Sequence, residues 1–142
     1  MFSLPVTDVM RQEQFVTASP ATTVADAAKL MARENAGAVV VVEGNALLGI
    51  FTKRDAVYRV LAEGLDPQAT PLSQAMTAQP RTVESTRLFG SALQIMSENG
   101  LRHLPVVENR RAIGIVTARN MFDPDLEEFV SEAQRRRYYA EP

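Results

Sequence analysis

The 142-residue chain is 46% hydrophobic and 23% charged, contains no cysteine, and carries a formal net charge of −2. This composition supplies enough apolar residues for a folded core, and it excludes disulfides, cysteine–metal sites and a general basic surface for nucleic acid. No apolar run approaches membrane-spanning length and the first residues lack the pattern of a signal peptide, so we expect a cytoplasmic protein that binds neither membranes nor nucleic acid.

The first unit of predicted elements runs strand, helix, strand, strand, helix. Its first helix follows Thr23, whose hydroxyl has capping-box spacing from Asp26. The apolar stripe that would face the core consists of Val24, Ala27, Ala28 and Met31. The predicted elements are a strand at residues 14–17, a helix at 24–35, a hairpin of strands at 37–42 and 46–51, and a helix at 56–63.

The turn between the second hairpin strand and the last helix is Thr52-Lys53-Arg54-Asp55. Thr52 and Asp55 have the spacing of a capping box, in which the hydroxyl and the carboxylate each bond a backbone N–H. Lys53 and Arg54 lie where helices prefer acidic residues, because the first turn is the positive end of the helix dipole. Free N–H groups, a hydroxyl and two cations together suit a phosphate. The residues leave open the alternative of an ordinary cap with solvated basic side chains.

A turn-rich connector over residues 64–71 leads to a second unit with the same order of elements. We expect Thr70 to cap its first helix, with Pro71 at the first helical position. The next helix would face the core with Leu88, Ala92, Leu93 and Met96. The predicted elements are a strand at residues 81–83, a helix at 85–99, and a hairpin of strands at 104–107 and 112–116.

The two units are related by an internal repeat. The pattern Gly49–Asp55 recurs as Gly114–Asn120, so Gly114 lies 65 residues after Gly49. An internal repeat of this length decides the architecture before any single motif does. It divides the chain into a first repeat, residues 1–66, a second repeat, residues 67–122, and a tail, residues 123–142. Pairs that keep the same offset are Ala27 and Ala92, Met31 and Met96, Val41 and Val106, and Val42 and Val107.

The tail predicts a C-terminal helix that starts at Asp123-Pro124. Its acidic residues come first and Arg135-Arg136-Arg137 come last, which suits the helix dipole. We therefore interpret the three arginines as a helix C-terminus rather than a nucleic-acid patch. Phe129 and the Tyr138-Tyr139 pair would dock on the body of the protein or on a partner subunit.

Together these features resemble a tandem pair of cystathionine-beta-synthase (CBS) domains, or Bateman module, of a stand-alone CBS domain protein. The resemblance rests on the repeat, the apolar strand pairs, the Gly-x-x-Thr-x-Arg-Asp turn at residues 49–55, and the Leu-Pro-Val-Val strand at 104–107. It implies an α+β fold in which two βαββα repeats pack as a pseudo-twofold pair, here with a C-terminal helix added. It also implies two clefts that bind adenine nucleotides or related adenosyl compounds.

The resemblance assigns ligand-binding roles to residues of both repeats. Thr52 would contact phosphate, and Asp55 would accept hydrogen bonds from the ribose hydroxyls, a task that suits an acceptor-only carboxylate. Lys53 and Arg54 would add positive charge for the phosphates. The other positions that match the site are Thr17, Ala38, Val39, Thr82, Arg102, His103, Leu104, Pro105, Thr117, Arg119 and Asn120.

The second repeat departs from the family pattern at Asn120, where an acidic residue is expected. An uncharged amide makes weaker hydrogen bonds to hydroxyls than a carboxylate does, so we expect the first repeat to hold the better site. Arg102 and His103 would instead reach phosphates across the central cleft. For His103, the sequence also allows a purely structural role with one hydrogen bond.

The leading functional interpretation is a regulatory module that binds AMP, ATP or NAD and senses energy or metabolite state. The nucleotide would be a regulatory ligand and not a catalytic cofactor, and the chain would act on an unidentified enzyme or transporter. We expect no enzyme activity, because the sequence has no metal-ligand cluster and no Gly-rich phosphate loop. The main alternative is a structural or adaptor protein that binds a partner enzyme with empty clefts. Slow nucleotide hydrolysis is a third, weaker hypothesis.

We expect a homodimer built on the helices of both repeats. Alanines on more than one face of the helix at residues 24–35 allow another backbone to approach closely, and twofold dimers are the commonest closed assembly. The second-repeat helix offers Leu88, Leu93 and Ile95 with few charges. The alternative is a monomer in which the tail folds back over these faces.

Overall fold

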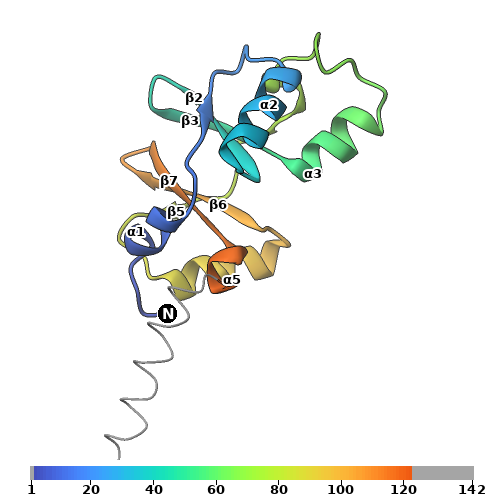
Figure 1. The fold of residues 1–142 in the computed structure, drawn as a ribbon. Coiled ribbons are helices and arrows are strands. Elements are labelled where there is room, and N and C mark those ends of the chain that lie inside the picture. The colour runs from blue at the N-terminus through green and yellow to red at the C-terminus, as the bar shows by residue number, and fades with distance from the viewer. Residues whose placement is uncertain (1, 123–142) are drawn as a thin grey trace, which may run out of the picture.

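The computed structural model describes residues 2–122, which form two halves with matching elements, stacked one above the other in Figure 1. The first half contains β1 (Thr17–Ala18), α2 (Val24–Glu34), β2 (Ala38–Glu43), β3 (Ala46–Thr52), α3 (Lys53–Asp55) and the π-helical η2 (Ala56–Leu61). The second half contains β5 (Val83–Glu84), α5 (Phe89–Asn99), β6 (His103–Glu108), β7 (Arg111–Thr117) and the 3-10 helix η3 (Ala118–Phe122). A leading segment precedes each half: α1 (Val6–Val9) with η1 (Met10–Gln12), and α4 (Leu72–Ala75) with β4 (Thr77–Ala78).

One mixed sheet joins the halves, in the strand order β1-β2-β3-β7-β6-β5, with β4 also paired to β3. In each half an antiparallel hairpin is bordered by a short parallel strand. The strand register repeats between the halves, since Ala38 lies opposite Thr52 in the first hairpin and His103 lies opposite Thr117 in the second. The predicted α+β fold with two repeated units is therefore confirmed.

The two long helices begin differently. Thr23 caps α2 through its hydroxyl, which accepts a hydrogen bond from the Asp26 N–H at 3.2 Å. Leu88 occupies the same position before α5, makes no side-chain cap, and is 46% exposed. The predictions that this helix begins at residue 85 and that Leu88 faces the core are wrong. The first buried residue of the helix is Phe89, which belongs to the core of the second half.

Each leading segment packs in the core of the opposite half. Val6 and Val9 of α1 belong to the core of the second half, whereas Leu72 and Ala75 of α4 belong to the core of the first. Figure 1 shows α1 beside the second half, near α5, although α1 lies at the start of the chain. Because the exchange is reciprocal, neither core is complete without a segment from the other half. The division of the chain after residue 66 stays a prediction.

Two methionines of the leading segments lie directly on the hairpin backbone. A Cβ atom at Gly49 would lie 2.5 Å from Sδ of Met76, and a Cβ atom at Gly114 would lie 2.5 Å from Sδ of Met10. Glycine suits both positions because a bare backbone leaves room for the methionine.

Two further predictions about helices are wrong. Thr70 does not cap α4, because Pro71 is the residue that precedes this helix, and the Thr70 hydroxyl donates to the Asp66 carbonyl at 2.7 Å. Ala28 is exposed, so it does not belong to the core stripe. The buried stripe of α2 is narrower than the pattern indicated and contains Val24, Ala27 and Met31.

A third apolar cluster lies between the two halves. It brings Ala38, Val40 and Ile50 of the first hairpin against Ile115 of the second. These side chains alternate along the strands with those of the repeat cores, as the period of a β-strand requires. No helix within residues 2–122 is long and apolar enough to cross a membrane. The C-terminal helix predicted for residues 123–142 lies outside the described residues.

Candidate functional site

The first turn, Thr52–Asp55, connects β3 to the helix α3 and is closed by a complete capping box. The Thr52 hydroxyl accepts a hydrogen bond from the Asp55 N–H at 3.2 Å, and Asp55 Oδ2 accepts one from the Thr52 N–H at 3.0 Å. The other carboxylate oxygen, Oδ1, lies 3.5 Å from Nε of Arg59, one turn further along the helix. The predicted capping box is confirmed, and it fixes a largely buried carboxylate at the start of a helix.

The two basic residues of the first turn point to different surroundings. The Lys53 N–H donates to the Gly37 carbonyl at 3.1 Å, which holds the turn against the residue that precedes β2. The exposed Lys53 side chain lies close enough to His103 of the second half to affect its titration. The Arg54 guanidinium lies 5.0 Å from the centre of the Tyr58 ring, so it stacks along the helix surface.

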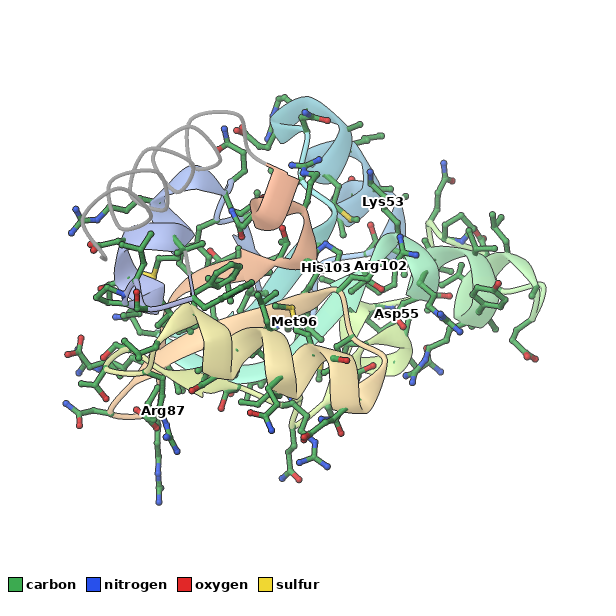
Figure 2. The ribbon with its side chains drawn as sticks, turned by 90° about the horizontal axis from the view of Figure 1, so that it is seen from below. Lys53, Asp55, Arg87, Met96, Arg102 and His103 are labelled. Atoms are coloured by element: carbon green, nitrogen blue, oxygen red, sulfur yellow. The ribbon has the colours of Figure 1, made fainter. Side chains whose placement is uncertain are left out.

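His103, the only histidine in the chain, reaches the first turn from the second half. A Cβ atom at Gly37 would lie 2.7 Å from its Nε2 atom, so the imidazole rests on the backbone beside the first turn. Burial, and then the charges of Lys53, Arg119 and Arg102, lower the pKa of His103 from 6.5 to about 4. Figure 2 shows Lys53, Arg102 and His103 toward the same part of the molecule, as their electrostatic effect on the imidazole requires. The imidazole is therefore neutral at physiological pH, and no hydrogen bond to it is found within residues 2–122.

The second turn, Thr117–Asn120, has a different set of contacts. Asn120 Oδ1 accepts a hydrogen bond from the Thr117 N–H at 2.7 Å, which reproduces one half of the capping box. The Thr117 hydroxyl donates to Glu13 Oε1 at 2.9 Å, and Nη2 of Arg119 lies 3.4 Å from Glu13 Oε2. The Asn120 side chain is buried, and its Nδ2 atom has no hydrogen-bond partner among the described residues.

Other predicted site residues are not all available to a ligand through their side chains. Val39 and Leu104 are fully buried in the cores of the first and second halves. Ala38 lies in the cluster between the halves, and Pro105 is buried in β6. Thr17 is exposed in β1, whereas the half-buried Thr82 directly precedes β5. The four buried residues, Ala38, Val39, Leu104 and Pro105, lie next to the turns as strand partners of the residues that lead into the turns. What they present to a ligand there is their backbone.

Sequence reasoning missed two charged residues at these turns. Arg59 follows Asp55 by four residues on the same helix, a spacing at which ion pairs form, so this signal was present in the sequence. Glu13 gave no signal, because it contacts residues more than a hundred positions away in the chain.

The arrangement can bind a polar ligand that carries both hydroxyl and anionic groups. The first turn offers a carboxylate as acceptor, a hydroxyl as donor, and exposed cations from both halves. A carboxylate suits a diol, and cations suit phosphate. Residues 2–122 contain no group of three acidic or histidine side chains that could hold a metal ion.

The chain belongs to the CBS domain family, whose model matches residues 6–62 and 72–124. The CBS domain-containing protein YhcV of Bacillus subtilis is 38% identical over 103 residues, which cover 72% of this chain and 73% of YhcV. CBSCBSPB2 of Arabidopsis thaliana is 43% identical over 108 residues, covering 75% of this chain but 20% of its own length. The chain thus spans about a fifth of the length of that plant relative.

Solved structures of CBS domain proteins share the fold. A CBS domain protein from Burkholderia ambifaria MC40-6 is 30% identical with a TM-score of 0.76, covering 83% of this chain and 90% of that one. The CBS domain pair of protein MJ0100 is 25% identical with a TM-score of 0.73, covering 83% of this chain and 96% of that pair. That structure is a complex with 5′-methylthioadenosine and S-adenosyl-L-methionine. The predicted resemblance to a tandem CBS pair is confirmed.

Proposed function

We propose that the chain is a regulatory module that binds an adenine nucleotide, of the AMP, ATP or NAD type, at the first turn and performs no catalysis. One observation carries the proposal: a fixed, buried carboxylate and a hydroxyl share a single turn with cations and a neutral imidazole from the other half. Such a site matches two polar groups of a nucleotide, the ribose diol and the phosphate.

Each group of the capping box can still make a hydrogen bond to a ligand. The Thr52 hydroxyl accepts its backbone hydrogen bond and retains its own proton, which it donates to a phosphate oxygen. Asp55 commits Oδ2 to the backbone, and Oδ1 accepts from the ribose hydroxyls beside Arg59. Lys53 and Arg102 carry exposed charges near His103 and neutralise the phosphate from the two halves.

The relative MJ0100 supports the class of ligand. Both compounds in its complex, 5′-methylthioadenosine and S-adenosyl-L-methionine, contain adenosine. Neither compound carries a phosphate, so the preference for a nucleotide rests on the cations of this chain rather than on the relative. The regulated target, an enzyme or a transporter, would respond to whether the site is filled.

Isothermal titration calorimetry with AMP, ATP, NAD, S-adenosylmethionine and adenosine tests this function. We expect AMP to bind more tightly than adenosine, and the difference to shrink as salt screens the exposed cations. Equal affinities for AMP and adenosine would remove Lys53, Arg54 and Arg102 from the site. Absence of heat with every compound would instead favour an adaptor that binds a partner enzyme with empty sites.

We also propose that the chain forms a homodimer through its helices. Ala28 and Ala32 on α2 are exposed, and so are the larger apolar side chains of Val57, Tyr58 and Leu61 on η2. If these side chains gather into one patch, that patch suits a contact with another protein. Light scattering at micromolar concentration tests the dimer, since a mass near 15.6 kDa would contradict it.

Variants on α2 locate the interface. Ala28→Glu and Ala32→Glu should each dissociate the dimer, because a charge would be buried against the partner. Ala25→Glu, on the half-buried side of the same helix, is the matched control for which face is used.

A further inference from the structure

The donors of the second turn already hold an anion. The Thr117 hydroxyl donates to Oε1 of Glu13 at 2.9 Å, and Arg119 Nη2 lies 3.4 Å from Oε2 of the same carboxylate. Glu13 lies between η1 and β1, at the other end of the chain. Its side chain is only 10% exposed, so the carboxylate is held inside the protein rather than in solvent. Two donors from one turn therefore grip the two oxygens of a single buried acid.

A carboxylate in this position has the binding chemistry of a phosphate. Hydroxyl and guanidinium groups are the donors that proteins use for anionic oxygens, and charged hydrogen bonds of this type are strong. In the first turn, the Thr52 hydroxyl engages only the backbone of its own turn, and Arg54 stacks on Tyr58. Among the described residues, an acid from another segment therefore occupies the hydroxyl of the second turn, and no such acid contacts the hydroxyl of the first.

The sequence repeat shows the same asymmetry. In the leading segments the offset between the repeats is 66 rather than 65, since Met76 follows Met10 by 66 residues. At this offset the residue that corresponds to Glu13 is Gln79. Gln79 is neutral, exposed, and bonded through its N–H to the Leu48 carbonyl. The acid is thus specific to the segment that reaches the second turn.

We propose that Glu13 occupies the phosphate position of the second turn and closes that turn to phosphate-bearing ligands. The inference rests on the proposed function, because it assumes that both turns bind phosphate in the same way. An incoming phosphate meets a negative charge and must displace it from two donors. Wild-type protein therefore binds a nucleotide at the first turn only.

Asn120 fits this arrangement. Its Oδ1 atom lies 3.5 Å from the Thr117 hydroxyl, the same hydroxyl that donates to Glu13. An aspartate at position 120 would place a second carboxylate on this hydroxyl, and two like charges that close would repel each other. The neutral amide keeps the backbone half of the cap and leaves the hydroxyl to Glu13.

Calorimetry with AMP tests the proposal in a protein whose first turn is disabled. The starting variant is Asp55→Ala, and Glu13→Gln is added to it. We expect the double variant to bind AMP about tenfold more tightly than Asp55→Ala alone, because the negative charge that repels phosphate is removed and the neutral amide that replaces it is easier to displace from Thr117 and Arg119. Adding Arg119→Ala should abolish the gain. Glu108→Gln, which makes the same change of charge at an exposed strand end, is the matched control and should leave the affinity of Asp55→Ala unchanged.

The outcomes separate this inference from the proposed function. No gain on adding Glu13→Gln overturns the inference, whatever the wild type binds. An equal gain with Glu108→Gln assigns the effect to net charge and overturns it as well. A wild type that binds no AMP, together with a Glu13→Gln variant that does, refutes the nucleotide site at the first turn and supports the role of Glu13.

Discussion

The first and second turns share a backbone frame and differ in where their charges come from. The Lys53 N–H donates to the Gly37 carbonyl, and the equivalent Ala118 N–H donates to the Arg102 carbonyl. The strand pairings that lead into the turns are also the same. The acid of the first turn, however, is part of the turn, whereas that of the second comes from Glu13.

The repeat therefore keeps the fold, whereas the residues around the two turns have changed. Gly37 in the first repeat corresponds to Arg102 in the second, and Ala38 corresponds to His103. The small residues beside the first turn leave space, and the large residues of the second half fill it, since His103 rests on Gly37. The proposed nucleotide site at the first turn would thus take side chains from both repeats.

The largest expected effect is the loss of nucleotide binding when the acid of the first turn is removed. Asp55→Ala should weaken AMP binding by about 1.5–3 kcal/mol, the range for hydrogen bonds to a charged group. Asn120→Ala should change the affinity little, because the second turn is closed. Calorimetry measures both constants.

Asp55→Asn tests the role of the charge at the first turn, because it gives that turn the residue that the second turn has. The amide retains an acceptor for the Thr52 N–H, so the turn stays capped while the charge is lost. We expect most of the loss seen with Asp55→Ala. If Asp55→Ala binds AMP like the wild type while Asn120→Ala loses binding, the ranking of the two turns is wrong.

The next effect concerns the two glycines under the exchanged methionines. A Cβ atom at Gly49 would meet the flexible Met76 side chain and also the Thr77 carbonyl oxygen, at 2.8 Å. A Cβ atom at Gly114 would meet only the side chain of Met10, which can change rotamer. Gly49→Ala should therefore lower the free energy of unfolding by about 1–3 kcal/mol, and Gly114→Ala by clearly less. Urea denaturation measures both, and equal losses would contradict the asymmetry.

A smaller effect follows from His103, which has no titrating counterpart in the first repeat. Its pKa is about 4 in the folded protein and about 6.5 in the unfolded chain. Between these values the unfolded chain binds a proton that the folded protein does not. The contribution of His103 to the free energy of unfolding is therefore complete above pH 6.5 and falls as the pH drops toward 4. We expect a loss of about 1–2 kcal/mol, less than the full shift implies, because the ring is partly exposed to solvent.

The test compares wild type with His103→Gln in urea at pH 7, 6 and 5. Carboxylates titrate in both proteins, so the difference between the two curves isolates the imidazole. Because His103 is the only histidine, its ring signal in an NMR titration also reports the pKa directly. A midpoint near 6.5 would show that the ring is neither buried nor close to Lys53 in solution.

The sequence predicted the repeated fold, because hydrophobic periodicity and the offset of 65 residues are local and regular signals. It also predicted the Thr52 and Asp55 capping box, since that motif needs only three-residue spacing. It did not predict Glu13 at the second turn or the contact of His103 with Gly37, because both join segments distant in the chain. Local sequence patterns do not indicate which distant segments come into contact when the two halves exchange their leading helices.

The smallest expected effect compares the starts of the two long helices. Thr23 and Leu88 occupy the same cap position, with φ and ψ of −73° and 155° in one and −82° and 153° in the other. Only Thr23 places an oxygen on a free helix N–H. Leu88→Thr should therefore stabilise the protein by at most about 0.5 kcal/mol, because the hydroxyl would share the N–H of Ser91, which already donates to the Leu88 carbonyl at 3.0 Å.

Thr23→Leu is the reciprocal control for this cap and should lower the free energy of unfolding by about 0.5–1 kcal/mol, measured by urea denaturation, because the Asp26 N–H loses its acceptor. The two variants together test whether the backbone at position 88 can still accommodate a side-chain cap like that of Thr23. A stabilised Leu88→Thr protein answers yes, because the new cap then outweighs the burial lost from the covered half of the leucine. A destabilised one shows that Leu88 is covered in solution. The loss should then vanish on dilution if a second copy of the chain provides the cover, since a contact between copies depends on concentration and a helix cap does not.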